Sequence, residues 1–179
     1  MIRNIRFWLI SSEPGSAFEE GVNMFTWFTN ILKNLKDRIQ YRQSIKRHLN
    51  RFRKGAVKLQ SRENFLSLME SLNQGIGHPR TGTFVIPADA FQEIVQRSGG
   101  NPRVMEDLLG LPEHYLGNDP VVIFVRHMRN LRLPLGTEAG AYKDLWVPGG
   151  YTKGGIPEAV IDQLWHGDFI AAQLVYVFV

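Results

Sequence analysis

The chain has 179 residues, 44% of them hydrophobic, so it is long enough and apolar enough to bury a folded core. It has no cysteine, which excludes disulfides, thiolate metal ligands and a cysteine nucleophile. The formal net charge of +4 is unevenly distributed: residues 33–54 hold nine Lys or Arg and one Asp, a net of +8, and the rest of the chain sums to −4. Any attraction to a polyanion is therefore expected from this one segment.

The first ten residues, MIRNIRFWLI, carry two Arg and then a four-residue apolar run. This run is shorter than the roughly 7–15 residues of a signal-peptide core. No stretch approaches the roughly 20 apolar residues of a membrane span. We therefore expect a short strand or an irregular N-terminus, with neither a signal peptide nor a transmembrane segment.

A long helix is expected early in the chain. Within residues 22–54, apolar residues recur mostly at spacings of three and four, which is helical periodicity, and Lys and Arg occupy the opposite face. Ser61 has the side chain of an N-cap for a second helix over residues 61–73. The turn-rich GIGHPRTG segment then marks the predicted boundary between a helical N-terminal extension, residues 1–75, and a second domain, residues 76–179.

The second domain is predicted to have helices first and strands after them. The predicted helices, 88–100 and 101–110, end in glycine, and Asn101 is the N-cap of the second. Strands are predicted where β-branched and apolar residues cluster. They cover residues 83–87, 121–127, 131–136, 158–164 and 168–179. The chain is therefore expected to be an α+β protein: N-terminal helices, one of them long, basic and amphipathic, followed by a compact domain with a mostly antiparallel sheet.

Residues 136–157 form a predicted loop of about 22 residues, longer than the roughly 12–15 residues usual in a compact domain. Its glycines would let backbone N–H groups approach a bound molecule. Between them stand side chains that can contact a ligand: Glu138, Tyr142, Trp146, Tyr151, Thr152 and Lys153. The segment is either a loop that closes over a ligand or a long hairpin whose glycines only make turns.

Charged residues also stand at strand ends. Glu158 begins the apolar run after the loop, where a carboxylate can orient a ribose hydroxyl, stabilise an oxocarbenium-like centre or act as a general base if its pKa is raised. Arg126 and His127 end the strand 121–127 and point to opposite faces, so one of them can face a cleft. Arg126 can hold an anionic group through its guanidinium. The alternative is that all three are solvated residues beside a turn.

No metal site is predicted. The histidines His78, His114 and His166 lack the spacing of metal ligands, and the chain has no HExxH motif. It also has no P-loop, GxSxG or GxGxxG motif.

The basic segment 33–54 has three interpretations. Its Lys and Arg can contact nucleic-acid phosphates. Its helix can lie on an anionic membrane with the apolar face in the interface. Or its charged face is solvated and its apolar stripe packs on the body of the protein or on a partner protein. No base-reading motif accompanies it, so sequence-specific DNA recognition is not expected.

Three segments resemble a module found at the C-termini of large bacterial polymorphic toxins of the filamentous-haemagglutinin and Rhs type. They are SGGNPRVMEDLLGLPEHYLG, LRLPLGTEAGA and LWVPGGYTKGGIPEAVID, at 98–117, 131–141 and 145–162. The resemblance covers residues 83–170, about half of the chain. This chain departs from the module at Thr137 and Tyr142, where the module has Asn.

This resemblance implies a toxin-like effector. Such a protein would be made in a bacterial cytoplasm, exported or delivered to a target cell, and neutralised by a cognate immunity protein. The resemblance does not specify a reaction, because such modules include nucleases and NAD-consuming enzymes.

A weaker likeness, to ADP-ribosyltransferase-like enzymes, lies in GGYTKGGIPEAVIDQLWHGDFI. In that family a Gly-rich or aromatic loop leads into a strand that begins with the catalytic Glu, which would be Glu158 here. The Arg expected near the first strand would be Arg80 or Arg126. The family's Ser-Thr-Ser strand is missing.

Three functions are consistent with these features. The first is a toxin enzyme acting on NAD, in which Glu158 and Glu138 are the catalytic candidates, Arg126 holds the pyrophosphate and an aromatic residue of the loop stacks on nicotinamide. The second is a ribonuclease toxin with Glu138 or Glu158 as base and His127 or His166 as acid. In that case phosphate would be held by Arg126, Arg132 and Lys153. The third is a non-enzymatic module that binds a partner or a membrane.

Overall fold

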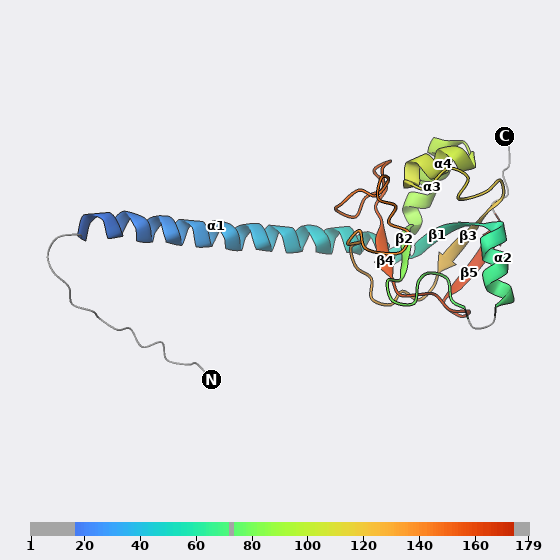
Figure 1. Ribbon diagram of the computed structural model, residues 1–179, viewed down its shortest axis with the longest axis horizontal. Coiled ribbons are helices and arrows are strands. Elements are labelled where there is room, and N and C mark those ends of the chain that lie inside the picture. The colour runs from blue at the N-terminus through green and yellow to red at the C-terminus, as the bar shows by residue number, and fades with distance from the viewer. Residues whose placement is uncertain (1–16, 72–73, 174–179) are drawn as a thin grey trace. The chain divides into compact units, whose positions relative to one another are not determined.

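The computed structural model describes residues 17–71 and 74–173 and divides the chain into two units, residues 1–43 and 44–179 (Figure 1). The boundary that we predicted, between residues 75 and 76, falls within the second unit. The reason is that residues 56–61 form the central strand of the sheet, so they cannot belong to a separate extension. The predicted elements at residues 1–10, together with residues 72–73 and 174–179, lie outside the described residues.

The predicted long helix is confirmed as α1, Ala17–Asn50, which continues into the 3-10 helix η1, Arg51–Lys54. The apolar periodicity along its length explains why it is helical. Its last turns, from Ser44, belong to the second unit, where Phe52 of η1 is fully buried. No helix within the described ranges is both long and apolar enough to cross a membrane.

The second unit contains a five-stranded antiparallel sheet, which confirms the α+β prediction. Its strand order is β4-β2-β1-β3-β5. The strands are β1 Ala56–Ser61, β2 Thr83–Pro87, β3 Pro120–Val125, β4 Ala159–Ile161 and β5 Phe169–Gln173. The central strand β1 was not predicted, because Lys58 and Gln60 interrupt its apolar residues and it lies between two helices.

Helices cover both faces of the sheet. On one face, α2, Arg62–Glu70, packs Phe65, Leu68 and Met69 against a core that includes Ile123 of β3. On the other, α3, Ala88–Ser98, and α4, Pro102–Leu109, contribute to a second core with Val57 of β1. Within β1, Ala56 belongs to the first core and Val57 and Leu59 to the second, as expected because neighbouring residues of a strand point to opposite faces.

The local signals at helix ends are confirmed. The Ser61 hydroxyl accepts a hydrogen bond from Asn64 N at 3.2 Å, and Asn101 accepts one from Arg103 N at 2.9 Å. Gly99 and Gly110 close α3 and α4 in the left-handed conformation. The strand predicted at 131–136 is wrong: only Arg132 forms an isolated bridge, to Val160, and Pro134 has no N–H with which to continue it.

One irregularity of the sheet creates the site described below. β1 pairs with β3 over its whole length but with β2 only at Ala56↔Pro87 and Val57↔Ile86. Beyond those pairs the two strands separate, and residues 57–59 and 83–86 line the opening between them.

Candidate active site

A cavity of about 110 Å³ lies where β1 and β2 separate, bordered by the end of α4 and by the loop after residue 138. For comparison, an engineered cavity of roughly 150 Å³ accepts benzene, so this smaller space is of the order of one aromatic ring. Most of its wall is apolar. The polar and aromatic side chains in the wall belong to Lys58, Thr83, Phe84, Tyr115, Tyr142, Trp146, Thr152 and Glu158.

Glu158 is held at the edge of the cavity by its main chain. It immediately precedes β4, whose register with β2 pairs Ala159 with Val85. Its N–H donates to Gly150 O at 2.8 Å, and its carbonyl accepts a hydrogen bond from His48 Nε2 at 2.9 Å. The backbone of Glu158 is therefore tied both to the glycine-rich loop and to the last turn of α1.

The Glu158 carboxyl is the most perturbed acid in the site. Burial, and secondly the negative charge of Glu138, raise its pKa from 4.5 to about 7. Its side chain is almost completely buried, since the residue is 8% exposed. A carboxyl with a pKa near neutrality can both take up and release a proton under physiological conditions.

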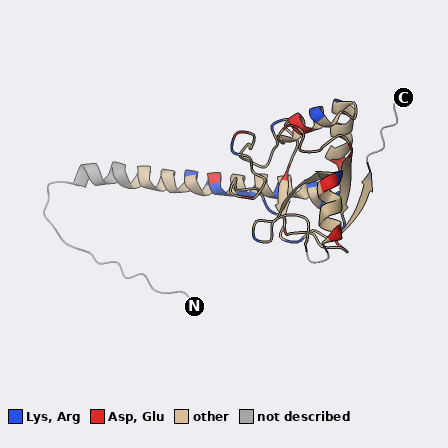
Figure 2. Ribbon diagram, turned by 45° about the vertical axis from the view of Figure 1, so that its right-hand side comes forward, with Lys and Arg blue, Asp and Glu red and all other residues tan. Residues whose placement is uncertain are grey.

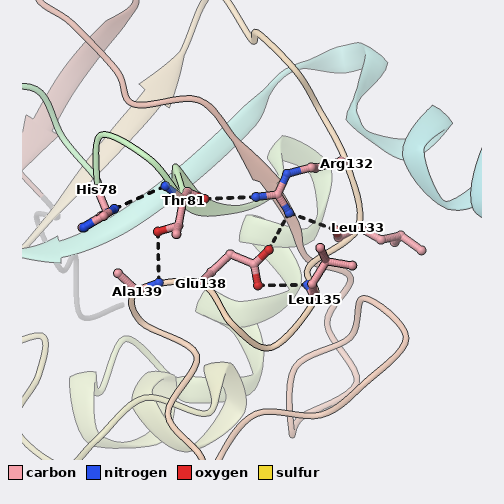
Figure 3. A network of polar contacts seen from close by, with 7 residues as sticks. All are labelled: His78, Thr81, Arg132, Leu133, Leu135, Glu138 and Ala139. Atoms are coloured by element: carbon pink, nitrogen blue, oxygen red, sulfur yellow. Dashed lines mark hydrogen bonds and ion pairs between the residues drawn. The ribbon is translucent and has the colours of Figure 1, made fainter.

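Glu138, whose polar contacts are drawn in Figure 3, has the opposite character, although it too is buried. Burial alone would raise its pKa, but hydrogen bonds from the Arg132 guanidinium at 2.5 Å and from Leu135 N at 2.9 Å outweigh it and lower the pKa. Glu138 is therefore ionised while Glu158 is protonatable. Two acids whose pKa values are pushed apart in this way are a common arrangement in active sites.

The Arg132 guanidinium is fixed within a wider network (Figure 3). Its second terminal nitrogen donates to Thr81 O at 3.1 Å, and the Thr81 hydroxyl accepts from Ala139 N at 3.1 Å. The Arg132 main chain exchanges two hydrogen bonds with Val160 of β4, at 2.8 and 2.9 Å. Arg132, which binds the Glu138 carboxylate, is hydrogen-bonded to β4, and Glu158 immediately precedes β4. Both carboxyl groups are therefore positioned by this strand.

Aromatic residues also line the cavity. The Tyr115 and Tyr142 rings meet edge to face with centroids 6.1 Å apart. Burial, followed by the charge and hydrogen bond of Tyr142, raises the pKa of Tyr115. The Trp146 indole N–H is buried and has no hydrogen-bond partner within the described residues. A buried donor without an acceptor is costly unless a ligand supplies one.

Gly136 and Gly150 allow the rings of Trp146 and His48 to pack against the backbone. Gly136, at φ +78°, lies against the Trp146 ring, and a Cβ at this position would come within 2.8 Å of the indole. Gly150, at φ +80°, lies against the His48 ring, and a Cβ there would come within 2.9 Å of Nε2. Any other residue would be strained by the backbone conformation and would displace an aromatic ring.

Two residues of this region were not predicted from sequence. Lys58 of β1 lines the cavity, and burial lowers its pKa to about 8; within the described chain it forms no ion pair with a carboxylate. His48 is buried, and its ring packs edge to face on Tyr151, with centroids 5.1 Å apart. Lys58 could have been noticed in the sequence, because it interrupts an apolar run. His48 could not, because it lies among the Lys and Arg residues of the basic segment 33–54.

The structure brings some of the predicted site residues together. Glu158, Tyr142, Trp146 and Thr152 line the cavity, and Glu138 is close enough to act electrostatically on Glu158. The Thr152 hydroxyl is already engaged, because it donates to Leu108 O at 2.6 Å.

Other predicted residues lie away from the cavity. Arg126 is exposed after β3, where its N–H donates to Asp168 O at 2.7 Å. Tyr151 packs on His48, and Lys153 forms an ion pair with Asp107 at 2.6 Å. The His127 N–H also donates to Asp168 O, at 3.2 Å, and the His166 ring stacks on Phe169.

Arg80 lines a second, polar cleft beside the cavity, together with Arg132, Asn130 and Asp162. The two spaces share Gly82 in their walls. In the described ranges, no group of three or more His, Asp or Glu side chains is placed to hold a metal ion.

The influence of Glu138 on Glu158 is directly testable. Glu138→Gln removes the neighbouring negative charge, so the pKa of Glu158 is expected to fall from about 7 toward its ordinary value. A pH titration of side-chain carboxyl carbons by NMR measures it, with Glu158→Gln identifying the resonance. Glu113→Gln, which alters an exposed turn residue, is the matched control. An unchanged or higher pKa in Glu138→Gln would contradict the proposed pairing.

Comparisons with models of protein families, with curated proteins and with solved structures find no match to this chain.

Proposed function

We propose that this chain is a toxin or effector enzyme that breaks the nicotinamide–ribose bond of NAD, passing ADP-ribose to water or to a target molecule. One observation carries the proposal: Glu158, with its pKa raised to about 7, lies in the wall of a ring-sized, aromatic-lined cavity next to an ionised Glu138. The sequence resemblance to bacterial toxin modules supports delivery to a target cell and a cognate immunity protein.

The size and chemistry of the cavity suit the nicotinamide ring. Tyr142 and Trp146 offer aromatic surface to the ring. The unpartnered Trp146 N–H offers a donor to the carboxamide oxygen. When the bond breaks, its electron pair stays with the ring nitrogen and nicotinamide leaves as a neutral molecule, which an apolar cavity accommodates better than the cationic ring of NAD.

The two acids have distinct roles in this reaction. Positive charge develops on the ribose as the bond breaks, and the negative charge of Glu138 favours it. Water, or the acceptor group of a target, then attacks the ribose carbon, and Glu158 takes up the proton that this nucleophile loses. Glu158 must be deprotonated to do so, and with a pKa near 7 about half of the molecules are in that state at neutral pH.

The phosphates of NAD would lie in the polar cleft next to the cavity. Arg80 and Arg132 are the cations in its wall, and the shared Gly82 joins the two spaces. This placement favours Arg80 over Arg126 as the arginine that contacts the pyrophosphate, because Arg126 lines neither space.

A ribonuclease is the second candidate. A carboxyl with a pKa near 7 can also accept the proton of a ribose 2′-hydroxyl, and the net +8 segment 33–54 would attract RNA. The aromatic residues in the wall of the cavity favour NAD, because they can pack on the nicotinamide ring, whereas phosphodiester binding needs several exposed cations and Lys58 is the one cation in the described wall of the cavity.

The test is to incubate the purified protein separately with NAD and with total RNA, and to follow nicotinamide release by chromatography and RNA length by gel. Release of nicotinamide with intact RNA is the expected result. Shortened RNA with intact NAD would establish the second candidate instead. If both substrates stay intact, also in the presence of a cell lysate that supplies acceptor proteins, the enzymatic proposal is wrong and the chain is a binding module.

A further inference from the structure

The described part of α1 carries an exposed apolar surface. Seven large apolar side chains between Met24 and Ile39 are 48–73% exposed. They are Met24, Phe25, Trp27, Phe28, Leu32, Leu35 and Ile39. Side chains of this size are uncommon as a contiguous exposed group, and such a group normally marks an interaction site.

These residues form a stripe along one side of the helix. Phe25, Phe28, Leu32, Leu35 and Ile39 are spaced alternately by three and four residues, which places them on one face. We call this set, together with Met24 and Trp27, the apolar face of α1. The next positions in the same spacing are Arg42 and Lys46, so the stripe ends in cations, and Lys and Arg are not confined to the opposite face as the sequence pattern predicted.

Positive charge borders the apolar face. Lys36 lies one helical turn beyond Leu32, and Arg38 lies three residues beyond Leu35, so both flank the stripe. In Figure 2 the turns of α1 that follow the grey segment are tan, and blue Lys and Arg begin further along the helix. Within the described chain, none of the Lys or Arg residues between 33 and 47 forms an ion pair with a carboxylate.

We propose that α1 lies in the surface of a lipid membrane with anionic headgroups, its apolar face at the boundary with the acyl chains and its Lys and Arg on the phosphates. Aromatic and leucine side chains on one face with cations around them are the features of helices that bind in the plane of such a surface. Trp27 and the two Phe suit the interfacial depth. Each Lys or Arg near an anionic leaflet adds attraction.

Neither RNA nor a second copy of the helix would contact both the apolar and the charged side chains of this surface favourably. RNA would neutralise the cations but leave the exposed Phe, Trp and Leu side chains in water. A second copy of the helix in parallel orientation would cover the stripe, yet it would bring Lys36, Arg38 and Arg42 of both copies together with Asp37 as the one carboxylate between residues 36 and 42, and like charges at a helix interface are unfavourable. An anionic membrane can bury the apolar side chains and at the same time pair the Lys and Arg with phosphates.

Flotation of the full chain with vesicles tests the proposal. We expect binding to phosphatidylcholine vesicles that contain about 30% phosphatidylglycerol, weak binding to pure phosphatidylcholine, and release at about 0.5 M NaCl. Phe25→Ser with Phe28→Ser should weaken binding at least about tenfold by loss of buried apolar area, and Lys36→Glu with Arg42→Glu by a similar factor. Leu66→Ser, which alters an exposed leucine of α2, is the control and should bind unchanged.

Two measurements separate the rival occupants. Sedimentation equilibrium without vesicles detects self-association, and gel mobility with total RNA detects nucleic-acid binding. No flotation with anionic vesicles, or flotation that both double variants retain in full, would overturn the proposal. Circular dichroism of each variant shows that helix content is kept, and none of the substituted residues lines the cavity. The result is therefore independent of whether the chain cleaves NAD.

Discussion

The Glu158→Gln protein is expected to release nicotinamide from NAD at least about 100-fold more slowly than the unchanged protein, because a general acid–base group contributes roughly 10²–10⁴-fold. The substitution keeps the size of the side chain and removes its ability to take up a proton. Initial rates measured by chromatography, over a range of NAD concentrations, separate the effect on kcat from any effect on KM. The loss should lie in kcat.

The pH dependence of the proposed reaction distinguishes a proton-transferring Glu158 from a structural one. Because the base must be deprotonated, kcat/KM of the unchanged protein should rise through about pH 7, where burial and the charge of Glu138 place the pKa of Glu158. Glu158→Gln should lose this rise, whereas the exposed control Glu113→Gln should retain both rate and profile. Full activity of Glu158→Gln would remove Glu158 from the mechanism.

The second large effect is on stability. The pKa of Glu158 is about 7 in the folded protein against an ordinary value of 4.5, so the folded state binds more protons than the unfolded state between these pH values. Stability therefore falls as the pH rises from 4.5 to 7, and above pH 7 the ionised, buried carboxylate costs about 3 kcal/mol.

Glu158→Gln removes that cost, because its amide is never charged. We expect the variant to be up to about 3 kcal/mol more stable than the unchanged protein at pH 8 and little different at pH 4. Urea unfolding of both proteins at the two pH values measures the difference, and other titrating groups cancel in the comparison. Equal stabilities at pH 8 would mean that the carboxyl is not buried in solution. A gain in stability with a loss of activity is typical of catalytic groups in unfavourable surroundings.

Helix ends were the most predictable part of the fold. Ser61, Asn101, Gly99 and Gly110 act within a few residues of themselves, because capping bonds and left-handed backbone conformations are local. The sheet was less predictable. β1 is recognisable only when its neighbours are known, since Lys58 breaks its pattern and the neighbouring strands, not its own residues, bury it on both faces.

The candidate site, like the fold, was predictable from sequence only in part. From composition alone, the glycine-rich loop that ends at Glu158 was either a loop that closes over a ligand or a hairpin whose glycines only make turns. The chemical character of Tyr142, Trp146 and Glu138 follows from their identity. Arg126 and Lys153 illustrate the limit of this reasoning: both can bind phosphate, but neither lines the cavity. Side-chain chemistry says what a residue can do, whereas its distance from other residues decides whether it does so.

By itself, the sequence determined the α+β class, the long basic helix and the loop with its carboxylate, because periodicity, capping and glycine content act over short segments. Only the tertiary structure decided that β1 and β2 separate to open a cavity, that Arg132 keeps Glu138 ionised, and that burial beside this charge raises the pKa of Glu158 to about 7. The physical reason is that desolvation and Coulomb interactions depend on which distant segments meet in space.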